Sequence, residues 1–404
     1  MVFIGALLIA GFVLFTGWNL LGARELKQQH QIDSKTLFDL VKLSFGVVAG
    51  AGALVALVVA YRRQRVDEDA ALRDTTRLHN ERFTTAVSQL GDTSPTVRLG
   101  GVHALSGLAD DAPSRELRQT CIDVLCAFLR LPYTAESDLP AGDSTARHDY
   151  LALREARHTV IRLIRDHLRL PQENPQSWQG HDFDFTSTVF DGGDLSGAEF
   201  SGGTVTFANA SFVSGTVHFS ETVFSGAHAD FQRTVFSDAT VMFTGAKFSG
   251  GIVNFYGAEF SGGVVEFNGT LFSGGMILFI GSTVCGGTLR FHGAVFNGGS
   301  IHFTGINVSD GSANFRRVTL SGGRLDFTGS RLSGGTVIFR EADLRGGSLD
   351  FTGSRFADRA ISFHEATYSG GTLNFRGGQG SLPAGLREAV GSPLPAGVTF
   401  ADGW

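Results

Sequence analysis

The sequence predicts a mainly β protein built around a β-solenoid, and three observations in its second half carry that prediction. Phenylalanine recurs every twelve residues without a miss from Phe207 to Phe375. A second apolar series follows five residues behind the first, from Phe212 to Tyr368. Pairs of glycines recur between the two series. A strict period of this kind is typical of a solenoid, in which each unit buries its apolar face against its neighbours.

One repeat unit explains how each position is used. Val205 lies two residues before Phe207, and this spacing places both side chains on the same face of a strand. In the five-residue half, the equivalent position usually holds a small residue such as Ala210, which fits a tight corner beside a bulky neighbour. Glycine pairs such as Gly202-Gly203 allow positive φ angles at a turn repeated in every coil.

The small-x-large element that recurs every five residues resembles the pentapeptide repeat family. The match is best in VFDGGDLSGAEF, where Phe190, Leu195 and Phe200 are five apart. After Phe200 the chain departs from the family pattern, because alternate units carry two extra residues and the spacing becomes five plus seven. The resemblance covers about half of the chain and implies a right-handed, four-sided β-solenoid. It implies no single function, because the family is defined by its scaffold.

The length of one coil is either 12 or 24 residues. A 12-residue coil would be two-sided and would have little room for two aromatic rings per layer at the packing density of protein interiors. A 24-residue coil would have four sides and hold four large and four smaller inward residues. The sequence therefore favours 24 residues without excluding 12.

Two apolar stretches predict a transmembrane hairpin over residues 1–61. Residues 2–21 and 43–61 carry no charge, and each is long enough to cross a bilayer. A cleaved signal peptide is the alternative for the first stretch, but it lacks a basic n-region. Gly46 and Gly50 form a G-x-x-x-G motif, which predicts a helix–helix contact and a homo-oligomer through these glycines.

Basic residues predict which side of the membrane each segment occupies. Arg62, Arg63 and Arg65 directly follow the second stretch, which favours the cytoplasmic side. The polar connector 22–39 would then be a short external loop. We expect a multi-pass protein of the cell membrane with both termini and the C-terminal domains in the cytoplasm.

Residues 62–170 predict a cytoplasmic α-helical domain. Ser94-Pro95 is typical of a helix start, and the two helices that follow resemble a HEAT-type hairpin. Residues 150–169 form an amphipathic helix with a face of arginines. That basic face is either solvated or in contact with anionic lipid headgroups.

The solenoid itself is expected over residues 171–380, and both of its ends need covering because they expose unpaired strand edges. We expect the preceding helices and Trp178 to cover the first coil. Residues 381–404 are expected to form a C-terminal cap, because Val398 and Phe400 repeat the solenoid signature after the period has stopped.

No catalytic, cofactor-binding or metal-ligating residues emerge from the sequence. The chain lacks the G-x-S-x-G, Walker A, H-E-x-x-H and C-x-x-C motifs. Cys121 and Cys126 are expected to be small core residues, and Cys285 to occupy a solenoid turn as a reduced thiol. The histidines of the repeat fall on unlike phases, so a shared metal is not expected; they are His218, His228, His292, His302 and His364.

These observations predict a non-enzymatic, membrane-tethered scaffold that presents its solenoid to a protein partner. The alternative is a DNA mimic that regulates a type II topoisomerase, as some members of the resembled family do. Residues 181–270 hold ten acidic and two basic residues, whereas 271–380 hold seven acidic and ten basic residues. This mixed surface, with a net charge of −6 over all 404 residues, argues against a nucleic-acid partner. An unidentified enzyme with a site at the junction of helical domain and solenoid is the third hypothesis.

Overall fold

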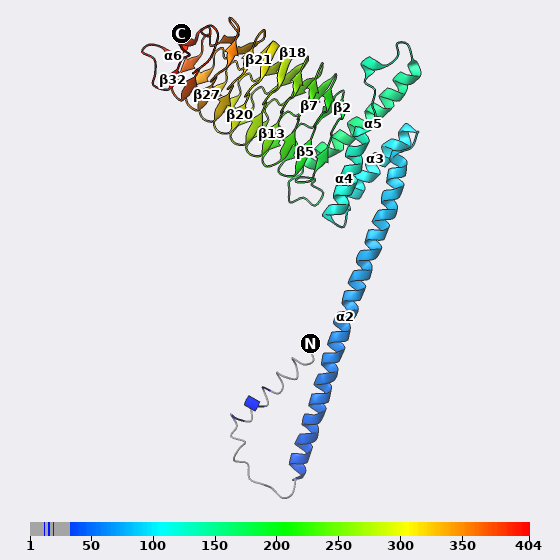
Figure 1. Ribbon diagram of the computed structural model, residues 1–404. Coiled ribbons are helices and arrows are strands. Elements are labelled where there is room, and N and C mark those ends of the chain that lie inside the picture. The colour runs from blue at the N-terminus through cyan, green and yellow to red at the C-terminus, as the bar shows by residue number, and fades with distance from the viewer. Residues whose placement is uncertain (1–11, 13–14, 17–18, 20–32) are drawn as a thin grey trace. The chain divides into compact units, whose positions relative to one another are not determined.

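The structure, a computed structural model, describes residues 12, 15, 16, 19 and 33–404. Its contacts divide the chain into two compact units, residues 1–74 and 75–404. The second unit contains both the helical segment and the solenoid, which Figure 1 shows in cyan to green and in green to red. The predicted span 2–21 lies outside the described residues except for four positions.

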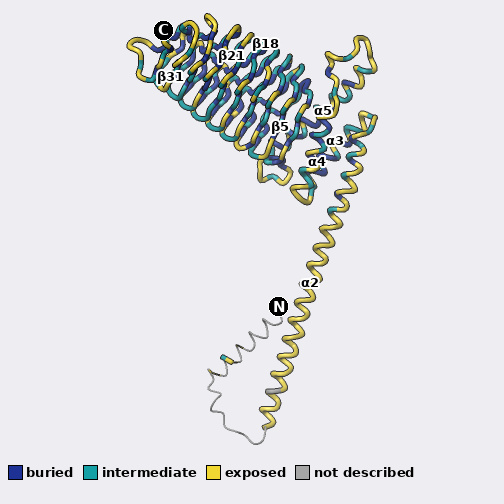
Figure 2. The backbone as a smooth tube through the Cα atoms, in the orientation of Figure 1, coloured by how far each residue is buried: buried dark blue, intermediate teal, exposed yellow. Residues whose placement is uncertain are grey.

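Helix α2 (Ser34–Leu90) contains the second predicted span. It begins inside the predicted connector 22–39, because nothing between Ser34 and Leu43 breaks a helix. It ends at Leu90, directly before Gly91, a residue type that commonly follows the end of a helix. Among the described residues it is the one helix long and apolar enough to cross a membrane, and that apolar stretch is exposed throughout (Figure 2).

Three further α-helices precede the solenoid. Helix α3 (Pro95–Asp110) begins with proline after Ser94, and α4 (Arg115–Arg130) begins after Ser114, whose hydroxyl accepts a hydrogen bond from the Leu117 amide. A short 3-10 helix, η2 (Glu136–Asp138), leads to α5 (Ser144–Leu168), which Asp143 caps. The buried faces of α3, α4 and α5 pack against one another around Leu105, Leu125 and Val160.

Parallel pairing fixes the coil of the solenoid at 24 residues. Thr204 pairs with His228, and Ile252 pairs with Met276, so each strand lies beside the strand one 24-residue repeat later. Most coils contribute four strands, and the coils of β18 and β21 contribute three, to sheets of ten, fourteen and eight strands, here called sheets A, B and C. Figure 1 draws β5, β13, β20 and β27 of sheet A as one row. The 12-residue alternative is therefore wrong. The four-sided cross-section and the right-handedness of the solenoid remain predictions.

The strands of sheet A are β1 (Phe183–Asp184), β5 (Thr204–Thr206), β9 (His228–Asp230), β13 (Ile252–Asn254), β17 (Met276–Leu278), β20 (Ser300–His302), β23 (Arg324–Asp326), β27 (Ser348–Asp350), β31 (Thr372–Asn374) and β32 (Val398–Thr399). Those of sheet B are β2 (Val189–Phe190), β3 (Gly193–Asp194), β6 (Ser211–Phe212), β7 (Thr216–His218), β10 (Val235–Phe236), β11 (Thr240–Met242), β14 (Glu259–Phe260), β15 (Val264–Glu266), β18 (Thr283–Arg290), β21 (Asn307–Asn314), β24 (Arg331–Leu332), β25 (Thr336–Ile338), β28 (Arg355–Phe356) and β29 (Ile361–Ser362). Those of sheet C are β4 (Glu199–Phe200), β8 (Val223–Phe224), β12 (Lys247–Phe248), β16 (Leu271–Phe272), β19 (Val295–Phe296), β22 (Thr319–Leu320), β26 (Asp343–Leu344) and β30 (Thr367–Tyr368).

Aromatic ladders fill the interior, as the twelve-residue series predicts. The rings of Phe243 and Phe267 stack with their centroids 4.8 Å apart and an interplanar angle of 4°. A second ladder runs beside the first, and Phe255 meets Phe267 edge to face at 6.4 Å. Both arrangements suit the quadrupole of the ring, so the same side chain is stabilised along the stack and across it. These phenylalanines are all fully buried.

The turns between the strands depend on glycines, which have no side chain to collide with the neighbouring coil. At Gly251, φ is +71°, and a Cβ atom would lie 2.2 Å from the Ala227 carbonyl oxygen of the previous coil. The predicted turn at Cys285 is wrong, because Cys285 lies inside β18, which runs through to Arg290 with shifts in register. Two consecutive glycines after Cys285 permit that extended path.

The C-terminal segment closes the last coil with apolar contacts. Strand β32 pairs with β31, as the signature at Val398 predicts. The Trp404 ring lies 5.2 Å from Phe375 and 5.7 Å from Phe356, and its indole nitrogen donates to the Gly380 carbonyl. Helix α6 (Leu386–Val390) buries Leu386 beside this end.

Candidate functional site

Side chains of the helical segment satisfy the open N-terminal edge of the solenoid. Arg157 donates to the Val189 carbonyl at 2.6 Å, and Arg169 donates to the Ser196 carbonyl at 2.7 Å. From α4, Gln119 donates to the Asp182 carbonyl at 2.8 Å. An unpaired strand edge in contact with solvent is an aggregation hazard, so these bonds both dock the helices and protect the edge.

Ion pairs reinforce the same docking. Arg130 of α4 pairs with Asp184, and Arg165 of α5 pairs with Asp194. Both alternatives for the basic face of helix 150–169, solvent or lipid, are therefore wrong for most of its arginines. They contact the first coil because that coil is rich in carboxylates and exposed carbonyl groups.

Asp191 is the centre of this junction. It follows Phe190 in the first coil and is buried. One carboxylate oxygen accepts hydrogen bonds from the hydroxyls of Tyr133 at 2.6 Å and Tyr150 at 2.7 Å, and the other lies 3.3 Å from His158 Nε2. The Arg154 guanidinium completes the shell at 3.3 Å. A buried charge with partners on both oxygens is stable only while all of them remain.

The pKa values at the junction follow from this shell. Burial alone would raise the pKa of Asp191, but the hydrogen bonds from His158, Tyr133 and Tyr150 outweigh it and hold that pKa well below its usual range. Burial and the bond to Asp191 raise the pKa of Tyr150 to about 12. At neutral pH, Asp191 is therefore an ionised acceptor and Tyr150 a neutral donor.

Trp178 lies where the sequence predicts a residue that covers the first coil. It is fully buried, its ring stacks on His167 with centroids 4.1 Å apart, and its indole nitrogen donates to Asp110. Asp110 also lies 3.1 Å from His167 Nε2. These contacts join the ends of α3 and α5 to the segment that enters the solenoid.

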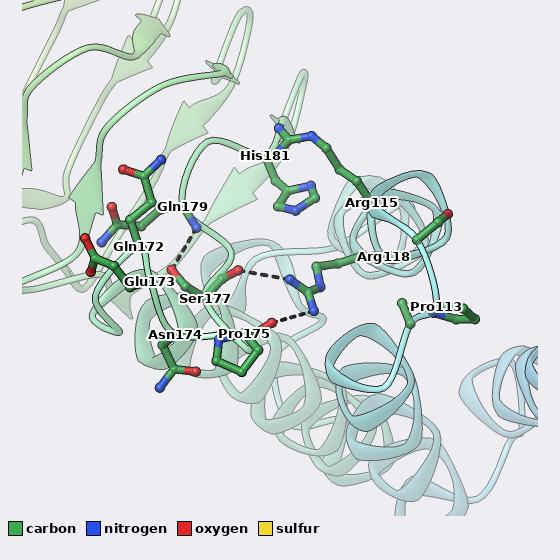
Figure 3. A pocket seen from close by; sticks show the side chains of 12 residues that line it. Pro113, Arg115, Arg118, Gln172, Glu173, Asn174, Pro175, Ser177, Gln179 and His181 are labelled. Atoms are coloured by element: carbon green, nitrogen blue, oxygen red, sulfur yellow. Dashed lines mark hydrogen bonds between the residues drawn. The ribbon is translucent and has the colours of Figure 1, made fainter. Parts of the chain in front are cut away.

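Two cavities of about 420 Å³ each lie at the junction. The first is drawn in Figure 3, where Arg118 donates to the carbonyls of Pro175 and Ser177. Burial and the nearby charges of Arg115 and Arg118 lower the pKa of His181 to about 4, so this histidine is neutral at pH 7. The second cavity is lined by residues of α5 and of β3 and β7, among them Arg162 and His218.

His181 and Ser177 of the first cavity are already engaged in structural bonds. His181 bonds through Nδ1 to the Gln119 side chain, and the Ser177 hydroxyl donates to the Leu170 carbonyl. A nucleophile needs an adjacent base, and neither serine of the first cavity contacts a histidine. The geometry therefore does not favour an enzyme at the junction.

The residues singled out in the sequence do not converge on one site. Cys121 and Cys126 are buried in the helical core, where burial raises the pKa of Cys121 to about 11. Of the repeat histidines, His302 lies 3.4 Å from Asp326. No group of three or more His, Cys, Asp or Glu residues in the described part of the chain is placed to hold a metal ion. Gly46 and Gly50 lie on α2 with open space around them.

One apolar patch interrupts the polar outer surface of the solenoid. The exposed large apolar side chains of the described solenoid are Ile252, Met276 and Tyr256, which are 38%, 39% and 48% exposed. All three belong to the neighbouring coils of β13 and β17, where Ile252 lies beside Met276. Half-buried Leu278 and Ile280 complete this group of five, called the sheet A patch. The twelve-residue period did not reveal this patch, because the period describes the inward positions and not the outer surface.

Comparison with known proteins agrees with this architecture. Residues 185–235 match the family model for pentapeptide repeats, which describes nine copies. A search among curated proteins and a search among solved structures each found no match. The fold defines a repeat protein whose coils stack on one another. The family match over residues 185–235 and the solenoid together support a pentapeptide repeat protein, as the sequence predicts.

Proposed function

We propose that this protein is a non-enzymatic, membrane-tethered scaffold whose β-solenoid presents a surface to another protein. The observation that carries the proposal is the combination of an exposed apolar helix and a densely packed repeat domain in one chain. Leu43, Phe45 and Val48 of α2 are each more than two-thirds exposed. A helix that is apolar all round needs lipid or a protein core to cover it.

The two-span topology rests on the sequence pattern together with this helix. Residues 2–21 form the first span, 43–61 the second, and the arginines at 62, 63 and 65 hold the following domains in the cytoplasm. The solenoid is right-handed and four-sided in this proposal. The four strands of most 24-residue coils support the four sides, and the family match supports the right hand.

The DNA-mimic alternative is not favoured. Mimicry needs a continuous array of exposed carboxylates, but three acidic residues of the first coil are engaged with the helices. Asp184 and Asp194 are paired with arginines, and Asp191 is buried. Part of the acidic excess of residues 181–270 is therefore used to bind the helices to the first coil.

Membrane attachment and sidedness are tested with the full chain in cells. We expect the protein to stay in membranes washed with alkaline carbonate. In a Cys285→Ser background, Gln28→Cys in the connector should react with a membrane-impermeant maleimide in intact cells. Asp402→Cys should react only after permeabilisation. Release by carbonate would contradict the tether, and labelling of both positions from the same side would contradict the hairpin.

A further inference from the structure

The sheet A patch lies close to the middle of a long sheet. Strands β13 and β17 are the fourth and fifth of the ten strands in sheet A. The patch spans both of them, whereas the neighbouring strands present polar side chains, including His228 and Asp230 on one side and Ser300 and His302 on the other. An apolar centre with a polar rim is the anatomy of a protein–protein interface.

We propose that a second copy of this chain covers the sheet A patch, with the two solenoids antiparallel. A two-fold axis along the strands, between β13 and β17, overlaps eight strands of each copy. At a strand spacing of about 4.8 Å, those eight strands make a face roughly 38 Å long and 15 Å wide. Two such faces bury roughly 1,150 Å² in total, close to the lower end of the range for specific interfaces.

This axis brings apolar residues of the two copies together. It reverses the order of the coils and keeps the direction of the strands, so Ile252 faces the partner's Met276 and Tyr256 faces the partner's Ile280. Leu278 faces the partner's Asn254. Burying these side chains removes the exposed apolar surface that each copy carries alone, which stabilises the pair.

Charge selects the antiparallel arrangement over the parallel one. In the antiparallel pair, Asp230 faces the partner's His302. In a parallel pair the central position of each strand would face itself, so Asp230, which has no ion-pair partner among the described residues of its own copy, would meet an identical carboxylate. Like charges placed opposite each other are destabilising.

One like-charged pair remains in the antiparallel arrangement, between Asp184 and the partner's Asp350. Each is already neutralised within its own copy. Asp184 pairs with Arg130, and Asp350 lies 3.3 Å from Arg324. The charges across the whole solenoid favour the same orientation, because residues 181–270 are mainly acidic and 271–380 are mainly basic.

This inference specifies one contact of the proposed scaffold and does not depend on the membrane helices. Self-association through Gly46 and Gly50 would be a separate contact. The test therefore changes only the solenoid and also records whether the chain remains in carbonate-washed membranes, so that failure of the dimer and failure of the tether give different results.

The first experiment measures the mass of the full chain in detergent over a range of concentrations. We expect a dimer for the natural sequence and at least a tenfold higher dissociation constant for Met276→Glu. The matched control is Val264→Glu. Val264 is the first residue of β15, just as Met276 is the first residue of β17, but β15 belongs to sheet B. This variant should dimerise like the natural protein.

Unchanged thermal unfolding of Met276→Glu will show that its solenoid is intact. A natural chain that stays monomeric overturns the proposal. So does a dimer that Met276→Glu leaves intact, which would point to the membrane helices. A monomeric chain whose patch is protected in membranes by a different protein also overturns it.

The second experiment tests orientation with cysteine pairs. Asp230→Cys and His302→Cys are made on separate, differently tagged chains that carry Cys285→Ser, and the chains are co-expressed. These central positions face each other in the antiparallel pair, whereas each would face itself in a parallel pair. A short bis-maleimide reagent should cross-link the two variants to each other and leave each variant alone largely unlinked. Cross-linking of each variant with itself, at the level of the mixture, would establish parallel solenoids and overturn the proposed arrangement.

Discussion

The two ends of the solenoid face the same physical problem and meet it with different chemistry. At the N-terminal end, helices α4 and α5 satisfy the open edge with arginine, glutamine and tyrosine side chains around the buried Asp191. At the C-terminal end, the chain adds strand β32 and covers the last aromatic rings with Trp404. One end is closed by charge and hydrogen bonds, and the other by backbone pairing and aromatic contact.

The difference shows what each closure demands of its surroundings. A buried carboxylate is stabilised only by a complete set of partners, so the N-terminal closure depends on the whole helical segment. Apolar contact has no such requirement, so the C-terminal closure needs only a short segment of chain. We therefore expect the two ends to respond differently to mutation and to pH.

The largest effect is expected for Asp191→Ala. The change leaves the hydroxyls of Tyr133 and Tyr150, the Arg154 guanidinium and the His158 ring without their acceptor. It should lower the free energy of unfolding by about 3–5 kcal/mol. Thermal unfolding of the full chain in detergent measures this loss. Asp358→Ala, an exposed aspartate near the other end, is the control and should lie within about 0.5 kcal/mol of the natural protein. Equal effects of the two substitutions would argue against the central role of Asp191.

A smaller effect is expected for Trp404→Ala at the C-terminal end. Trp404 is half-buried, so losing its contacts with Phe356 and Phe375 should cost about 1–3 kcal/mol, less than a fully buried aromatic residue. The same unfolding experiment measures it. Leu394→Ala, in an exposed position of the same segment, should change little. A loss larger than that of Asp191→Ala would reverse the proposed ranking of the two ends.

Acid should weaken only the N-terminal closure. The pKa of Asp191 is lower in the folded protein than in the unfolded chain, so its stabilising effect is complete above the unfolded value. That effect is lost as the pH falls below about 4 toward the folded value. Melting temperatures between pH 5 and pH 2 should therefore fall more steeply for the natural protein than for Asp191→Asn. Parallel curves for the two proteins would contradict the assignment.

Periodicity predicted the solenoid well because a strict repeat leaves little freedom. Once Phe207 and its counterparts are inward, the strand face, the turn and the neighbouring coil follow from covalent geometry. Packing density correctly favoured the 24-residue coil. The extended strand through Cys285 was not predicted. The two glycines that follow Cys285 can adopt either a turn or an extended conformation, and the sequence does not show which one they adopt.

The junction could not be predicted in the same way. A helical period identifies the arginine face of residues 150–169, but it cannot tell whether solvent, lipid or protein covers that face. The sequence did contain one signal, which is charge complementarity. Four acidic residues between 182 and 194 follow soon after the basic helix. Asp191 itself sits in a Gly-rich turn of the repeat, and its partners Tyr133 and Tyr150 lie in a segment without a clear period.

Hydrogen–deuterium exchange along the full chain tests the contrast between the two ends most directly. Amide exchange should be compared in the natural protein, Asp191→Ala and Trp404→Ala. We predict that Asp191→Ala accelerates exchange in residues 183–230 and leaves 350–399 protected, and that Trp404→Ala does the reverse. Acceleration of the same segments by both substitutions would contradict separate closure of the two ends.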